Sequence, residues 1–109
     1  MDRRPELRIE AAMLVRIWGM DRYWRPFTQV ATVREISLQG AVLAGVRSQV
    51  KPGEMLDVQY DGQHAQFRVV WSGRPGSLAA GEVGLERLVS EPYIWDIDLA
   101  RCTHFVGNG

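Results

Sequence analysis

Apolar and polar residues alternate over short stretches of this chain, and glycine or proline separates one stretch from the next. Residues 55–60 and 64–72 alternate most regularly, which predicts two β-strands that each bury one face. Between them lies Asp61-Gly62, a residue pair that favours a two-residue hairpin turn. The two stretches are therefore expected to form a hairpin whose buried face carries Leu56, Val58, Tyr60, Ala65, Phe67, Val69 and Trp71.

Four further stretches have the apolar and β-branched content of short strands. They span residues 12–18, 27–37, 40–44 and 82–89. After the last of them, Ser90 is a candidate helix cap and is followed by Glu91-Pro92, a pattern typical of a helix start. Residues 93–102 are therefore expected to form either a short C-terminal helix or an irregular packed tail.

Six short strands in a chain of 109 residues predict a single all-β domain. Because an open sheet edge invites pairing with other chains, a small six-stranded antiparallel β-barrel is favoured over an open sheet. A two-sheet sandwich is the alternative. The expected division is a flexible Arg-rich arm at residues 1–10, a barrel at residues 11–89 and a tail at residues 90–109.

Composition excludes several functional classes. The apolar fraction is 46%, and 13 basic residues balance 13 acidic ones, so the net charge is zero. A protein that binds DNA or RNA through its phosphate backbone usually carries a basic excess, so neither is expected as a partner. No apolar run approaches the length of a transmembrane helix, and the first residues contain no apolar signal-peptide core. We therefore expect a cytoplasmic protein without membrane insertion.

The zero net charge hides a gradient along the chain. Residues 1–34 contain seven arginines and four acidic residues, a net charge of +3, whereas residues 82–109 have a net charge of −3. Twelve of the 13 basic residues are arginine. A GC-rich genome would explain that preference, and so would a need for the planar guanidinium, which grips phosphate and guanine edges with two hydrogen bonds.

No arrangement of residues points to an enzyme. His64 is expected beside the hairpin turn, and His104 and the single cysteine, Cys102, fall in the C-terminal tail. None of them has the sequence context of an activated nucleophile or base. No spacing typical of a metal site or a phosphate-binding loop occurs. A binding module is therefore expected, with no catalytic residues, no metal and no resident cofactor.

The tryptophans are candidate stacking platforms for bases. Trp18 and Trp71 lie within strand patterns and are expected to pack in the core or at its rim. Trp24 follows Tyr23 in the predicted loop at residues 19–26 and has an arginine on its other side. It is the tryptophan expected to be exposed.

Two motifs change this interpretation. Arg4 and Arg8 form an RxxxR spacing before the first predicted strand, and residues 35–40 read Glu-Ile-Ser-Leu-Gln-Gly. Together they resemble the PilZ domain, whose signature is RxxxR followed by [D/N]xSxxG. The similarity extends over about residues 2–95, where segments such as FRVVW and VGLERL fall in comparable places. The family implies a six-stranded antiparallel barrel of the split-barrel type, often with a C-terminal helix, and many of its bacterial members bind cyclic di-GMP and relay that signal to a partner protein.

The resemblance also implies roles for individual residues. Arg4 and Arg8, with Arg3 beside them, would grip the phosphates and the guanine O6/N7 edge of the ligand. Ser37 would donate its hydroxyl, and Gly40 would allow the backbone a tight turn and a close approach to the ligand. Glu35 stands where the family has Asp or Asn, and it is one methylene longer than Asp.

The alternative is a degenerate PilZ-like module that docks a partner protein without nucleotide. Glu35 and the exposed Tyr23-Trp24 turn motivate it. An RNA-binding barrel is a weaker third hypothesis, because no basic stripe accompanies the aromatic residues. The sequence does not identify the effector protein.

Overall fold

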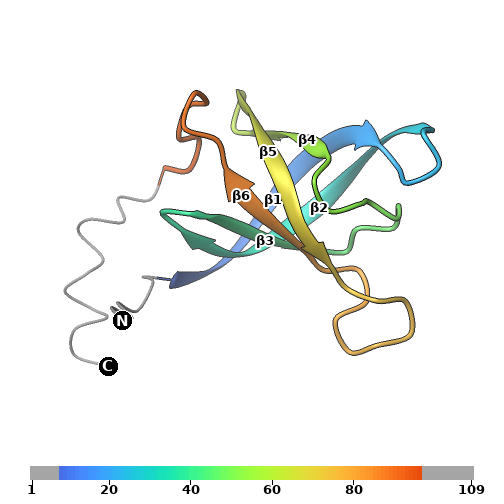
Figure 1. Cartoon of the computed structure of the whole chain (residues 1–109). Coiled ribbons are helices and arrows are strands. Elements are labelled where there is room, and N and C mark those ends of the chain that lie inside the picture. The colour runs from blue at the N-terminus through green and yellow to red at the C-terminus, as the bar shows by residue number, and fades with distance from the viewer. Residues whose placement is uncertain (1–7, 97–109) are drawn as a thin grey trace, which may run out of the picture.

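The computed structural model describes residues 8–96, and these form a closed barrel of six antiparallel strands (Figure 1). The strands are β1 (Arg8–Met20), β2 (Pro26–Ser37), β3 (Gly40–Ala44), β4 (Met55–Tyr60), β5 (Gln63–Ser72) and β6 (Val83–Arg87). Their order around the barrel is β1-β2-β3-β6-β5-β4. The all-β fold, the strand count and the barrel are therefore as predicted, and the two-sheet sandwich is not formed.

One prediction at the start of the barrel needs correction. Strand β1 begins at Arg8, so residues 8–10 belong to the sheet and not to an arm; they pair with residues 35–37 because β2 runs on to Ser37. At the other end, no helix occurs in the described residues. Residues 90–96 are irregular, which is one of the two alternatives expected for the tail. The remainder of the predicted tail, with Cys102 and His104, lies outside the described residues. No helix in the described part of the chain has the length and apolarity needed to cross a bilayer.

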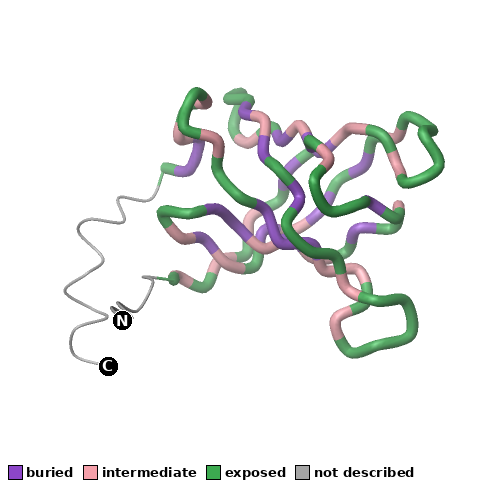
Figure 2. Tube along the Cα trace, viewed as in Figure 1, coloured by how far each residue is buried: buried purple, intermediate pink, exposed green. Residues whose placement is uncertain are grey.

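The hydrophobic core is built from alternate residues of all six strands, as the period of two requires (Figure 2). Ile94 and Trp95 follow the last strand and are also buried, and the Trp95 ring packs against the rings of Phe67 and Tyr60. The largest side chains with almost no exposed surface are Ile17, Ile36, Leu43, Leu56, Ile94, Val33, Val58, Val69 and Val83.

The β4–β5 hairpin is formed where the alternation predicted it. Asp61 and Gly62 have φ angles of 51° and 79°, and both angles lie in the left-handed region that a type I′ turn requires. Leu56 and Val58 are buried, as are Ala65, Phe67 and Val69. The expected face ends there, because the pairing of β5 with β6 shifts between Val69 and Trp71. The irregularity turns Trp71 out of the core, and 39% of its surface is exposed.

Strand β1 is paired unevenly on its two sides. It pairs with β2 along almost its whole length, from the Arg8–Ser37 pair to the Met20–Pro26 pair. On its other side it pairs with β4 only over Arg16–Gly19. The barrel is therefore closed between β1 and β4 by a short ladder.

The loop between β1 and β2 is held together by Asp21. Its carboxylate accepts hydrogen bonds from the backbone N–H groups of Tyr23 and Arg25, at 2.8 Å and 2.9 Å, and pairs with Arg25 Nε at 3.1 Å. Trp24 has a φ of 62°, in the left-handed region that a residue of its bulk seldom adopts. The carboxylate therefore fixes a tight loop that presents Tyr23 and Trp24.

We expect this loop to depend on pH. The hydrogen bond from the Arg25 backbone, followed by those from Tyr23 and the Arg25 side chain, lowers the pKa of Asp21 below its ordinary value of 3.8, against the opposing effect of desolvation. The ionised carboxylate is therefore the form that stabilises the loop: its contribution is complete above pH 3.8 and is lost as the pH falls through the lowered value.

The backbone amide proton shifts of Tyr23 and Arg25 should report this titration by NMR, since both groups bond the carboxylate. Their common midpoint is expected below 3.8 in the native protein. In the Asp21→Asn variant the same two amides should not titrate in this range. A midpoint at or above 3.8 would contradict the role given to Asp21.

A buried glutamine fixes the segment that follows β3. Gln29 Nε2 donates to the carbonyl oxygens of Val30 and Gly45, at 3.0 Å and 2.9 Å, and Gln29 Oε1 accepts the Arg47 N–H at 2.8 Å. Only 6% of Gln29 is exposed, so these bonds form where little water competes for them. They hold Arg47 in a fixed position at the end of the barrel.

Candidate functional site

Residues from both sequence motifs line one cavity of about 260 Å³ beside the turn between β2 and β3. Arg8, Glu35, Ser37 and Gly40 all contribute to its wall. The pairing of β1 with β2 brings the motifs together, because Arg8 lies opposite Ser37 in the ladder. Arg3 and Arg4 lie outside the described residues, so four of the six predicted site residues are placed by the structure.

Arg8 and Glu35 form an ion pair across the β1–β2 ladder. Arg8 Nη1 lies 3.5 Å from Glu35 Oε1, and the two side chains are 63% and 34% exposed. An ion pair this exposed contributes little to stability. It does matter to the site, because it places a carboxylate beside the one described arginine of the motif.

Ser37 organises the turn between β2 and β3. Its Oγ accepts hydrogen bonds from the backbone N–H groups of Gln39 and Gly40, at 3.1 Å and 3.2 Å. The Gln39 carbonyl in turn accepts the N–H of Arg87, at 2.6 Å, so this turn is tied to the end of β6. The Ser37 hydroxyl oxygen is thus an acceptor within the turn and fixes the backbone of Gln39 and Gly40 beside the cavity.

Gly40 has a structural role that the sequence did not reveal. It is buried, and an ideal Cβ at this position would overlap the carbonyl oxygen of Leu85 and lie 2.8 Å from the Leu85 carbonyl carbon. Strands β3 and β6 therefore approach each other at a point where no side chain fits. The resemblance implied a tight turn and a close approach to ligand, whereas the close approach seen here is to the neighbouring strand.

Trp71 is a residue of the site that was expected to pack in the core or at its rim. It lines the cavity, and its indole lies against Gly84 on the facing strand, where an ideal Cβ would be 2.6 Å from Trp71 Cδ1. Because Gly84 has no side chain, the indole can pack directly against the backbone of β6. A glycine inside a predicted strand is a sign of such close packing, and Gly84 was the signal available in the sequence.

The described residues that line the cavity carry no net positive charge. Arg8 is the only cation among them, whereas two carboxylate residues, Glu35 and Glu86, line the cavity. Glu86 is itself paired with Arg68, with 3.1 Å between Arg68 Nη1 and Glu86 Oε2. The wall thus combines an aromatic ring, one guanidinium and two carboxylates, which suits a planar heterocycle with N–H groups.

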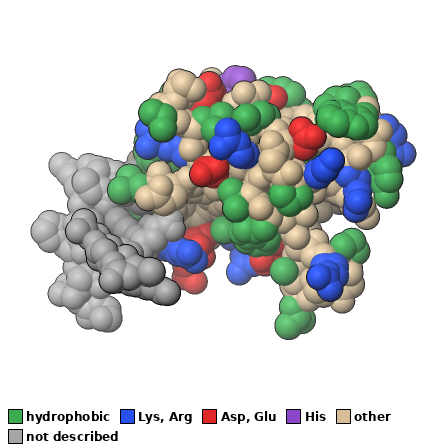
Figure 3. Space-filling view, viewed as in Figure 1, with side chains coloured by type: hydrophobic (Ala, Val, Ile, Leu, Met, Phe, Trp, Pro, Cys, Tyr) green, Lys and Arg blue, Asp and Glu red, His purple; other side chains and the backbone are tan. Residues whose placement is uncertain are grey.

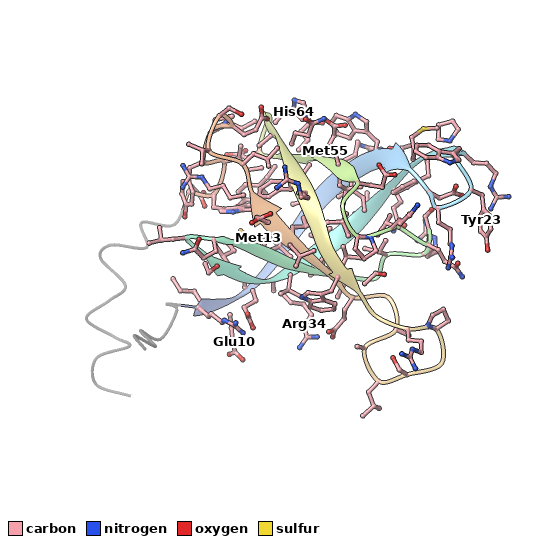
Figure 4. All side chains as sticks on the ribbon, in the orientation of Figure 1. Glu10, Met13, Tyr23, Arg34, Met55 and His64 are labelled. Carbon is pink, nitrogen blue, oxygen red and sulfur yellow. The ribbon has the colours of Figure 1, made fainter. Side chains whose placement is uncertain are left out.

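The histidine within the described residues has a packing role. The rings of His64 and Trp18 stack with centroids 5.2 Å apart, and His64 Nε2 lies 2.8 Å from Asp57 Oδ1. His64 is exposed, as predicted, and does not line the cavity; Figure 4 shows it near the tip of the β4–β5 hairpin. No group of three or more metal-ligating side chains occurs between residues 8 and 96.

A comparison of this sequence with known protein families and with curated proteins finds no match.

Proposed function

We propose that this domain binds cyclic di-GMP at the cavity bounded by Arg8, Ser37 and Trp71, and that binding relays a signal to a partner protein. The observation that supports the proposal is the β1–β2 register. It brings residues that are 27 or more positions apart in the sequence, and that the two motifs singled out independently, to one cavity.

The chemistry of the wall fits half of such a ligand. A guanine base can stack on the Trp71 indole while Arg8 bonds its O6/N7 edge or a phosphate oxygen. The acceptors Glu35 and Glu86 suit the guanine N1 and N2 hydrogens. A volume of 260 Å³ is small for a ligand pocket, since most measure about 300–1,000 Å³. One guanine therefore occupies the cavity, and the phosphates lie at its mouth.

Calorimetric titration with cyclic di-GMP tests the proposal. We expect saturable binding that quenches tryptophan fluorescence, and we expect the quenching to be lost in Trp71→Phe while the affinity changes little, because phenylalanine also stacks. Cyclic di-AMP is the matched control ligand, since adenine lacks the O6 acceptor that Arg8 would read. No heat at high micromolar ligand from a protein shown to be folded would overturn the proposal.

Glu35→Gln should strengthen ligand binding. Glutamine has nearly the same shape and keeps an acceptor oxygen, but it removes a negative charge beside Arg8 and near the ligand phosphates. Exposed ion pairs are worth about 0.2–1 kcal/mol, so we expect a gain in affinity of up to about fivefold. Glu10→Gln is the matched control: Glu10 lies opposite Glu35 in the ladder but does not line the cavity. Weaker binding by Glu35→Gln would contradict this expectation and would show that the negative charge of Glu35 strengthens its bond to the guanine more than it repels the phosphates.

The second candidate function is a nucleotide-independent docking module. The Arg8–Glu35 ion pair favours it, because that pair occupies the motif arginine without any ligand. Capture of a partner protein in the absence of nucleotide would support this function. Partner binding that strictly requires cyclic di-GMP would exclude it.

A further inference from the structure

A second cavity lies at the end of the barrel formed by three loops. Its volume is about 330 Å³, and it shares no lining residue with the first cavity. The three loops are residues 21–25, 45–54 and 73–82, which we call the loop end (Figure 1). No part of the proposed nucleotide site uses this surface.

The loop end is held together without any ligand. The Arg22 N–H donates to the Gln49 carbonyl at 2.8 Å, and the Val46 N–H donates to the Gly81 carbonyl at 3.0 Å. Each loop is thus bonded to another, in addition to the bonds that Asp21 and Gln29 make within this region. The cavity is therefore preformed.

Positive charge gathers at this end. The three loops contain five cations and three carboxylates, in a chain whose total charge is zero. Asp21 is paired with Arg25, and Glu82 is paired with Arg34. Among the described residues, no ion pair engages the remaining four cations, which are Arg22, Arg47, Lys51 and Arg74. Arg22 and Arg47 line the cavity itself and are exposed, and the one carboxylate residue that lines it, Glu82, is paired with Arg34.

The same loops carry exposed apolar side chains. Tyr23 and Trp24 are 59% and 65% exposed at the tip of the first loop, and Leu78 is fully exposed on the third. Figure 4 shows Tyr23 pointing away from the barrel, and Figure 1 shows the third loop standing clear of it. In Figure 3, hydrophobic and basic side chains alternate over this end of the molecule. The apolar groups are therefore separate tips around a basic cavity, not one flat patch.

We propose that the loop end docks on an anionic phospholipid bilayer. Trp24 and Leu78 enter the interfacial layer, and Arg22 and Arg47 receive a lipid phosphate in the cavity. Tryptophan and tyrosine favour the headgroup region, and basic residues are attracted to anionic lipid. A stable protein interface needs about 800 Å² of complementary surface on each partner, which separate projecting tips do not supply, whereas a fluid bilayer accommodates them. The proposed contact is with the interfacial layer of the bilayer.

Vesicle flotation tests the proposal. We expect binding to vesicles of phosphatidylcholine with phosphatidylglycerol, and little binding to phosphatidylcholine alone. Raising the salt from about 0.1 M to about 1 M should release the protein, because the screening length falls from about 10 Å to about 3 Å. Binding should be the same with and without cyclic di-GMP, so failure here leaves the nucleotide proposal standing, and the reverse holds as well.

Matched variants locate the contact. Arg22→Gln with Arg47→Gln should weaken vesicle binding about 30-fold, at about 1 kcal/mol for each charge, while Arg16→Gln with Arg87→Gln should not weaken it beyond about twofold. Trp24→Asn and Leu78→Ala should each weaken binding at least about fivefold. Asparagine is chosen at position 24 because it tolerates the positive φ of this residue. Val89→Ala removes a comparably exposed side chain that follows β6 and should have no effect.

Three outcomes would overturn the proposal. The first is no vesicle binding at low salt by the folded protein. The second is equal effects of Leu78→Ala and Val89→Ala. The third is binding of glycerol phosphate or polyglutamate without vesicle binding, which would assign the loop end to a soluble phosphate or to an acidic protein.

Discussion

Gly40→Ala is expected to destabilise the barrel by at least about 3 kcal/mol, at the upper end of the cost of overpacking. The added Cβ would overlap the carbonyl oxygen of Leu85, and both groups belong to backbones that the β3–β6 ladder holds in place. No side-chain rotation relieves the overlap, so the two strands must separate. The free energy of unfolding from urea titration measures the effect.

Gly84→Ala is the matched control for this prediction. It lies in the neighbouring strand beside the same cavity, but its Cβ would meet the Trp71 indole and not a backbone. The indole can move toward solvent, so we expect a loss of about 1–2 kcal/mol. A cost for Gly40→Ala equal to or below that for Gly84→Ala would contradict the close approach of β3 and β6.

Arg8→Ala is expected to weaken cyclic di-GMP binding by about 10- to 150-fold. The substitution removes charge-assisted hydrogen bonds worth about 1.5–3 kcal/mol, and it leaves Glu35 without the cation that offsets its charge. The stability of the protein should change by no more than about 1 kcal/mol, because the ion pair is exposed. Calorimetric titration measures the affinity, and urea titration checks the fold.

Arg16→Ala is the control for Arg8→Ala. Arg16 is also an exposed arginine of β1, and it does not line the cavity. Its removal should leave the affinity within about twofold of the native value. Equal losses from the two variants would show that binding depends on general charge and not on the motif. The double variant Arg8→Ala with Glu35→Gln should recover part of the lost affinity, because it no longer leaves an unpaired carboxylate.

The strands could be predicted because alternation and turn residues agree with the final fold. Asp61-Gly62 adopts the angles that its turn type demands, and the residues on either side alternate until Val69. Trp71 could not be placed in this way, since one extra residue in a strand reverses the face of everything after it. Such an irregularity depends on the partner strand, and its only trace in the sequence was Gly84.

The residues of the candidate site were predicted from the spacing of two motifs. The register between β1 and β2 is what brings them together. Nothing in the sequence states that Arg8 lies opposite Ser37, because register follows from how long β1 and β2 remain paired. Of the two forms expected for the C-terminal tail, residues 93–96 adopt the irregular one, for a related reason. Ile94 and Trp95 are adjacent and both buried, which an irregular segment crossing the end of the barrel allows more readily than one face of a short helix.

The short ladder between β1 and β4 has a consequence for dynamics. Among the described residues, Arg8–Val15 pair only with β2, so this half of β1 can open without breaking the rest of the barrel. Its amide protons should exchange with deuterium by local fluctuation, well before those of Ile17 and Trp18, which lie between two partner strands. The motif arginine thus belongs to a part of the sheet with a low opening free energy, and any ligand that bonds Arg8 would slow exchange along the whole half-strand.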